Sequence, residues 1–564
     1  MSPDGESLSY ARKACIPCRR SKRRCDRTLP SCDLCRRKEV ECGYPMRQQT
    51  ASHSSRLTVQ QHSLLDQSPG SPAFSIPQGP SHAVEVDANA VYFIAPHIFH
   101  QARLEFPKQE LPIPAEVLKL LGDASSIREI STIFFRTVHR WLPIISKKSF
   151  FTHLLNPLAQ RRTEFSLLAL CMKLCCTPSD DDAGVATRLY RAAKQFHFEV
   201  ETASTLSICT LQASILIALY ETAHAIYPAA YLTVGACARQ GLALGVDKLS
   251  MDSVRDGNGR ISSWQEVEER RRAWWAVLMF DRFLSLSNPS RALSTEDPPF
   301  DAFLPVDDAV WDDWSSTPGE SIRFSAGFNL KMGSFARLAQ ATRLLSQGLR
   351  SISLSASKGD VPQPDETSQL RRTLLALVSV VDREATVRKL EYCAPSALSL
   401  STILLLEENR TYQDSPHDSI ESSWLPFESL WPESHTALDR LLEAAVSYSA
   451  TCPAVPDAPH IVPIFLIHVM YQVVSILLRL SQGSPNGGIR DQISRIKHFL
   501  GQISTRWRLG GRSSGDRDII ELGRNAVEFP SSPIRTVTFL LHGDRALSWN
   551  RADGLKGYLV PSQQ

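Results

Sequence analysis

Six cysteines lie within 28 residues near the start of this 564-residue chain, and no other feature constrains its folding as strongly. They form two copies of the spacing C-x2-C-x6-C, one at Cys15–Cys25 and one at Cys32–Cys42. Thiols in such a repeat are either disulfide partners or metal ligands. The six residues are Cys15, Cys18, Cys25, Cys32, Cys35 and Cys42.

The rest of the sequence favours metal ligands over disulfides. The first ten residues are polar, so a secretory leader is not expected and the thirteen cysteines should stay reduced. A RING or LIM site needs eight ligands, and no histidine lies between the first and last of the six cysteines. We therefore expect an all-thiolate zinc site.

Counting ligands predicts two zinc ions that share thiolates. A C-x2-C pair can wrap one tetrahedral zinc, but three thiolates per half leave each site one ligand short. Two zinc ions have eight ligand positions, and six thiolates fill them only if two are shared. The internal repeat indicates that the first cysteine of each half, Cys15 and Cys32, forms the bridge.

The charge of the chain is concentrated around these cysteines. The whole chain has 62 Lys and Arg against 59 Asp and Glu, whereas residues 1–50 hold 12 against 6. A basic run, RRSKRR at 19–24, lies between the second and third cysteines. The segment therefore suits a polyanionic partner, and we expect this run to form about one and a half turns of helix between two ligands.

The segment ACIPCRRSKRRCDRTLPSCDLCRRKEVECGYP at 14–45 resembles the fungal binuclear zinc cluster family of transcription factors. Pro30, two residues before the fourth cysteine, matches the turn between the family's two short helices. The resemblance implies a zinc-organised module that binds double-stranded DNA in the nucleus. It also implies that the lysine four residues after the second cysteine, Lys22, contacts the guanines of a CGG triplet.

The other residues of the basic run are expected to position the module on DNA. The position before Lys22 is often basic in the family and is Ser21 here. Phosphate contacts are expected from Arg19, Arg20, Arg23, Arg24 and Arg27. Their counterparts in the second half are Arg36, Arg37 and Lys38.

The chain beyond the cysteines divides by composition. Ser, Gln and Pro make up 18 of the 34 residues at 48–81, which predicts a flexible linker. The expected organisation is a disordered tail at 1–10, the zinc module at 11–46, the linker at 47–111, an all-α regulatory domain at 112–310, a further helical region with loops at 311–545, and a tail at 546–564.

Three strings resemble the family's middle homology region: FFRTVHRWLPIISKKSFF (134–151), YLTVGACARQGLALGV (231–246) and EERRRAWWAVLMFDRFLSLSNPSRAL (268–293). Helical spacing places apolar residues of 208–226 near one face, and Glu266/Arg270 and Glu268/Arg272 are i,i+4 pairs. The stretch 461–478 predicts a buried helix rather than a membrane span. Further ion-pair candidates are Arg239, Arg271, Asp281 and Arg282, and Cys171, Cys175 and Cys176 are expected in the core.

Loops are expected at 351–368 and 414–434, which are rich in Ser, Pro and Asp. Two segments interleave acids with aromatics, at 306–314 and 421–433. Such segments can be activation surfaces, but loops within the helical domain are the favoured interpretation.

The sequence favours a regulator over an enzyme, since it has no P-loop, G-x-S-x-G, H-E-x-x-H or Rossmann fingerprint. The expected function is a pathway-specific activator of a fungal gene cluster, such as one for secondary metabolism. The alternatives are a repressor and an effector-sensing regulator that acts mainly through partners. The expected partners are CGG-containing promoters and the transcription machinery, with no membrane.

Residues 46–112 lack the apolar heptads of a coiled coil. A fragment covering 1–110 is therefore predicted to be monomeric, and any homodimer should form through the helical region.

Overall fold

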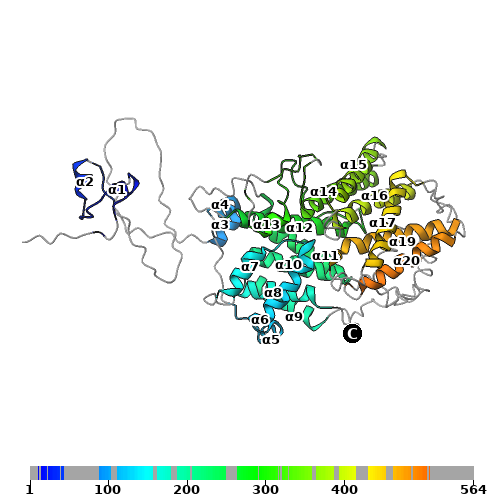
Figure 1. Cartoon of the computed structure of the whole chain (residues 1–564), viewed down its shortest axis with the longest axis horizontal. Coiled ribbons are helices and arrows are strands. Elements are labelled where there is room, and N and C mark those ends of the chain that lie inside the picture. Colours follow the sequence, from blue (N-terminus) through cyan, green and yellow to red (C-terminus); the bar gives the residue numbers. More distant parts are fainter. Residues whose placement is uncertain are drawn as a thin grey trace, which may run out of the picture. The chain divides into compact units, whose positions relative to one another are not determined.

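The computed structural model describes residues 11, 14–21, 23–38, 40–43, 88–102, 104, 111–156, 162–178, 187–203, 206–248, 263–289, 291–314, 317, 321–327, 330–358, 364–385, 393–413, 430–451, 461–483, 487–504 and 507. The chain divides into two compact units, residues 1–87 and 88–564 (Figure 1). Both expected tails, Lys22 and most of the expected linker lie outside the described residues.

The first unit contains two short helices, α1 (Ile16–Arg20) and α2 (Asp33–Arg37). Its buried core consists of Cys15, Cys18, Cys32 and Cys35. A unit whose core is thiols has little apolar area to stabilise it, so its stability must come from what the thiols bind.

The second unit is helical, as expected. Among its described residues, β-pairing is limited to one bridge between Phe303 and Arg323. Its helices are α3 (Ala88–Ile94), α4 (Pro96–Gln101), α5 (Ala115–Leu121), α6 (Ala124–Arg136), η1 (Val138–Arg140), α7 (Lys147–Leu155), α8 (Thr163–Cys176), α9 (Arg188–Thr202), α10 (Ile208–Ala223), α11 (Ala229–Ala243), η2 (Val246–Lys248), α12 (Trp264–Ser285), α13 (Asp308–Asp312), α14 (Ser334–Lys358), α15 (Pro364–Glu384), α16 (Cys393–Gln413), α17 (Pro432–Thr451), α19 (Ile464–Gly483) and α20 (Gly487–Ser504).

Side-chain caps define where several of these helices begin. Asp123 accepts a hydrogen bond from the Ser126 backbone N–H at the start of α6, and Ser263 accepts one from Glu266 at the start of α12. Ser207 and Thr210 form a reciprocal capping box at α10. Each cap satisfies backbone donors that the first helical turn leaves without partners.

Helix α10 is the central helix of the N-terminal half of this unit (Figure 1). It packs against α8, α9, α11 and α12, and every residue from Thr210 to Ala223 is buried. The sequence pattern predicted one apolar face, whereas the helix is buried all round. The difference arises because four neighbouring helices cover it, including positions with polar side chains.

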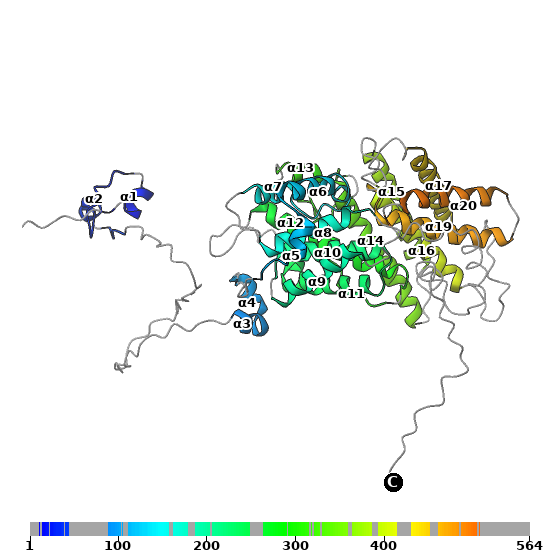
Figure 2. The same ribbon diagram turned by 90° about the horizontal axis from the view of Figure 1, so that it is seen from below.

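Two groups of helices meet along α14 (Figure 2). Helix α14 packs on α12 from the first group and on α15 and α16 from the second. One continuous apolar core runs from Val117 to Trp507. Residues on both sides of the expected boundary between 310 and 311 contribute to this core.

Helix α19 confirms the buried helix expected at 461–478, since Phe465, Ile467 and Val473 are inaccessible to solvent. Within the described part of the chain, none of the helices combines the length and apolar character that a membrane span needs.

The ion-pair candidates in α12 form buried networks. Arg272 donates to Glu268 at 3.0 Å, to Asp308 at 2.8 Å and to the Val306 carbonyl oxygen at 2.7 Å. Arg271 donates to Glu268 at 2.6 Å. Asp281 and Arg282 are also buried and paired at 3.2 Å. Arg239 differs, because it is exposed and donates only weakly, to the Gly235 carbonyl oxygen at 3.5 Å in its own helix.

These networks also account for the acidic and aromatic segment at 306–314. Its Trp311 is buried and its Asp308 pairs with Arg272, so the segment lies within the helical domain as expected, but it contains the short helix α13 instead of being only a loop. Cys171 and Cys175 are likewise buried in the core, and Cys176 packs against it.

Two expectations of irregular structure are wrong. Helices α3 and α4 lie within the expected linker, where Tyr92 and Phe99 pack edge to face with ring centroids 5.1 Å apart. The expected loop at 351–368 is largely helical, because Ile352 continues the apolar side of α14 and Pro364 occupies the first position of α15, where proline is tolerated. Of the expected loop at 414–434, residues 414–429 lie outside the described part, and α17 begins at Pro432.

Candidate metal centre and nucleic-acid interface

The two halves of the cysteine repeat adopt the same local structure. Cys15 precedes α1 and Cys32 precedes α2, each with an extended backbone (φ −61°, ψ 156° and φ −72°, ψ 151°). Each helix carries the second cysteine of its half, Cys18 or Cys35, in its first turn. The C-x2-C spacing therefore places both thiols of each half at the same helix end.

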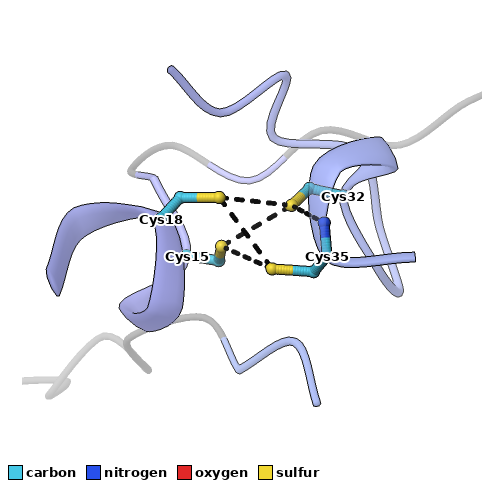
Figure 3. Close-up of side chains that lie close together, drawn as sticks. All are labelled: Cys15, Cys18, Cys32 and Cys35. Atoms are coloured by element: carbon cyan, nitrogen blue, oxygen red, sulfur yellow. Dashed lines mark hydrogen bonds between the residues drawn. The ribbon is translucent and has the colours of Figure 1, made fainter. Parts of the chain in front are cut away.

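Four thiols from the two halves converge (Figure 3). The Cys15 sulfur lies 3.6 Å from that of Cys32 and 3.6 Å from that of Cys35. The Cys18 sulfur lies 3.7 Å from that of Cys32 and 3.9 Å from that of Cys35. All four thiols are buried and within 4.8 Å of one another, close enough to hold a metal ion.

Cys25 and Cys42 complete the cluster at its edges. The Cys25 sulfur lies 3.7 Å from that of Cys15, and the Cys32 backbone N–H donates to the Cys42 sulfur at 3.3 Å. The Cys25 sulfur also lies within 4.8 Å of the Cys32 sulfur. Cys15 and Cys32 thus each lie close to cysteines of both halves of the repeat.

These spacings fit thiolate zinc. Four sulfurs about 2.3 Å from a tetrahedral zinc are about 3.8 Å apart. The sulfur–sulfur distances here run from 3.6 to 3.9 Å. The donor set contains only cysteine, which favours zinc over cations that prefer oxygen ligands.

The thiols differ in how readily they lose a proton. Burial raises the pKa of Cys15, and it raises the pKa of Cys32 to about 12. Burial also opposes ionisation of Cys25, but hydrogen bonds from the Cys15 and Arg27 backbones and from neighbouring thiols outweigh it and lower its pKa to about 7. The two central thiols therefore release protons when a metal binds, which makes binding depend on pH.

The described residues of the basic run are exposed, but they do not form one helix as expected. Helix α1 ends at Arg20, where the Ser21 hydroxyl donates to the Pro17 carbonyl oxygen at 2.8 Å. The Arg23 backbone N–H then donates to the Cys18 carbonyl oxygen at 2.9 Å. The chain must turn here because Cys25 has to return to the cluster. The exposed residues are Arg19, Arg20, Ser21, Arg23, Arg24 and Arg27.

The second half presents its basic residues differently. Arg36, Arg37 and Lys38 are exposed, but Arg36 pairs with Asp33 in the same helix. The α1 half has no acidic residue in the first turn of its helix, whereas Asp33 lies in the first turn of α2. The α1 half therefore offers the less neutralised surface to a polyanion.

Sequence reasoning missed Asp26, the residue after the third cysteine. Its carboxylate accepts from the Thr28 hydroxyl at 2.7 Å and from the Asp33 backbone N–H at 3.1 and 3.2 Å. Hydrogen bonds from Thr28 and from Asp33 hold the pKa of this carboxyl below its usual range. In the sequence, the one sign of this role is an acidic residue that directly follows a cysteine of the repeat and has basic residues on both sides.

Each of the two units matches a known protein family. Residues 13–51 match the fungal Zn(2)-Cys(6) binuclear cluster domain, and residues 132–382 match the fungal specific transcription factor domain. The second match crosses residue 310, in agreement with the continuous core. Together the matches indicate zinc binding and DNA binding by the first unit.

Three curated relatives are transcription factors of filamentous fungi. The chain is 41% identical over 160 residues to transcription factor BOA15 of Botryotinia fuckeliana, covering 28% of this chain and 86% of that protein. It is 24% identical over 301 residues to the azaphilone cluster-specific transcription factor azaR of Aspergillus niger (50% of this chain, 59% of that protein). It is 22% identical over 317 residues to the tropolone cluster transcription factor tropK of Talaromyces stipitatus (48% and 54%).

Four observations indicate the same family: the geometry of the thiols, the exposed basic residues, the all-α second unit and these matches. The chain belongs to the fungal Zn(2)-Cys(6) binuclear cluster transcription factors that carry a fungal specific transcription factor domain.

Proposed function

We propose that this protein is a nuclear, pathway-specific activator that binds CGG-type triplets in the promoters of a fungal biosynthetic gene cluster and recruits the transcription machinery. The convergence of four buried thiols, next to a run whose described basic residues are exposed, supports the DNA-binding part of this proposal. The similarity to azaR and tropK, which are named for an azaphilone and a tropolone cluster, supports the proposed pathway.

The proposed metal centre holds two zinc ions that share two thiolates. One ion is bound by Cys15, Cys18, Cys25 and Cys32, and the other by Cys15, Cys32, Cys35 and Cys42. This division is supported by the Cys25 sulfur, which lies 3.7 Å from that of Cys15 and within 4.8 Å of that of Cys32, and by the Cys42 sulfur, which accepts from the Cys32 backbone N–H at 3.3 Å. Four thiolates close each zinc, which leaves no open position for catalysis, so the ions act by holding the helices together.

The proposed DNA contacts come from the α1 half. Lys22 donates to guanine O6 and N7, a pattern that only guanine presents in the major groove. Ser21 and the exposed arginines Arg19, Arg20, Arg23, Arg24 and Arg27 contact phosphates and fix the orientation. The Ser21 hydroxyl is directed back to Pro17, which is consistent with a positioning role rather than base recognition.

The second unit is proposed to regulate activity and to carry any homodimer contact. Its continuous core supports a single folded body rather than separate modules. A second copy joined through this unit would bring two zinc modules to neighbouring triplets.

The decisive experiment combines promoter occupancy with deletion of the gene. Chromatin immunoprecipitation of the tagged full-length protein should recover CGG-containing promoters of one gene cluster, and deletion should silence that cluster. Increased expression after deletion would indicate a repressor instead. Occupancy that survives replacement of Cys15 would contradict DNA binding through the zinc unit.

A further inference from the structure

The two halves of the zinc unit are tied together by a reciprocal pair of hydrogen bonds, each donated by a backbone N–H. The N–H of Ile16, directly after Cys15, donates to the Gly43 carbonyl oxygen at 2.7 Å. The N–H of Asp33, directly after Cys32, donates to the Asp26 carboxylate at 3.1 and 3.2 Å. In both cases the acceptor is the residue that follows the last cysteine of the opposite half.

The two ties differ in what supplies the acceptor. Gly43 uses its backbone carbonyl, which any residue retains, whereas Asp26 uses its side chain, which a substitution can remove. Asp26 is also held by the Thr28 hydroxyl, which lies 3.2 Å from the Ser31 carbonyl oxygen, so the loop between the halves is fastened to the same carboxylate. One carboxylate oxygen lies within 4.8 Å of the Cys25 and Cys32 sulfurs.

We propose that Asp26 is a positioning residue for DNA recognition: it sets the orientation of α2 against α1 without binding zinc or DNA itself. The N–H that it caps begins the helix bearing Arg36 and Arg37, so its loss lets these arginines move relative to those of α1. This inference rests on the proposed recognition of DNA by the zinc unit.

The test uses the full-length protein with Asp26→Ala and Asp26→Asn. The alanine variant should keep two zinc ions by elemental analysis and an unchanged thiolate-to-metal spectrum after cobalt substitution. Its affinity for a CGG duplex should fall about tenfold, equivalent to about 1.4 kcal/mol. The asparagine variant should restore affinity to within about threefold, because its amide oxygen still accepts from the Asp33 N–H.

Two matched variants control for position and charge. Gly43→Ala keeps the carbonyl acceptor, and its added methyl would meet only the Ile16 Cδ1 atom at 3.9 Å, so it should bind like the wild type. Glu41→Ala removes one negative charge from an exposed site in the same unit and should not weaken binding.

Each other outcome overturns the inference. Wild-type affinity in Asp26→Ala means that the tie is dispensable, and an equally weak Asp26→Asn means that the charge, not the hydrogen bond, matters. Loss of zinc from Asp26→Ala means that the residue supports the cluster itself. A wild-type protein that lacks two zinc ions or ignores DNA refutes the proposed function, and this inference with it.

Discussion

The two units of this protein reach a defined structure by different means. In the first, four cysteines are the buried core and both helices are five residues long. In the second, helices of up to 25 residues surround one continuous apolar core. Short helices are unstable in water by themselves, so the first unit depends on its metal, whereas the second depends on apolar burial.

This contrast teaches that the same residue type has opposite roles in the two units. Cys15 and Cys32 are buried among other thiols, where we propose that they share two zinc ions, but Cys171 and Cys175 are buried as small apolar side chains. Burial raises the pKa of both kinds of thiol, including Cys171. Spacing, not burial, distinguishes a ligand from a core residue.

The largest expected effect comes from removing a shared ligand. Cys15→Ser should release both zinc ions and abolish sequence-specific DNA binding, because both proposed sites lose a thiolate. The helical unit should keep its thermal unfolding transition, as it should after chelation of the wild type. Cys176→Ser is the control and should retain two zinc ions. Elemental analysis measures the zinc content, calorimetry the unfolding transition and gel shifts the DNA binding.

Acid should affect the two units through different titratable groups. In the first unit these groups are the thiols. Metal binding displaces thiol protons, and the pKa of Cys32 is raised to about 12, so zinc affinity should fall as the pH falls from 8 to 5. A zinc-sensitive dye reports the release. Release that does not depend on pH would contradict binding to the thiols.

In the helical unit, burial lowers the pKa of His468 from 6.5 to about 4. The unfolded chain therefore takes up this proton first, and stability is lost as the pH falls from about 6.5 to 4, by about 1.4 kcal/mol per pH unit. His468→Gln should flatten that slope in urea unfolding and leave zinc release unchanged. An unaltered slope would assign the acid sensitivity to other groups.

Arg272→Ala should destabilise the helical unit without affecting the zinc unit. It removes a cation that joins Glu268, Asp308 and Val306, at an expected cost of about 3–5 kcal/mol in the free energy of unfolding. Zinc content should not change. Arg188→Ala, which breaks the exposed pair with Glu116, should cost less than about 1 kcal/mol in the same denaturant titration.

The smallest effects separate base recognition from phosphate contact. Lys22→Ala should remove about 1–3 kcal/mol of discrimination between CGG and scrambled sites. Arg19→Ala should instead weaken binding to all DNA and reduce the salt slope by about one. Equal discrimination by the Lys22 variant and the wild type, measured by competition titration, would exclude Lys22 as the base contact.

The sequence by itself determined the features that depend on local spacing. The C-x2-C-x6-C repeat identified the thiols that converge, and helical periodicity identified the all-α second unit and the buried α19. Both follow from local geometry, since ligand spacing and helical repeats are set within a few residues.

Only the tertiary structure decided the features that depend on distant partners. Glu268 and Arg272 were visible as an i,i+4 pair, but their burial follows from Asp308 and Val306, more than 30 positions away. The end of α1 at Arg20 follows from the need to return Cys25 to the cluster. The tie between Asp26 and Asp33 exists because the two halves fold onto each other, which no local pattern encodes.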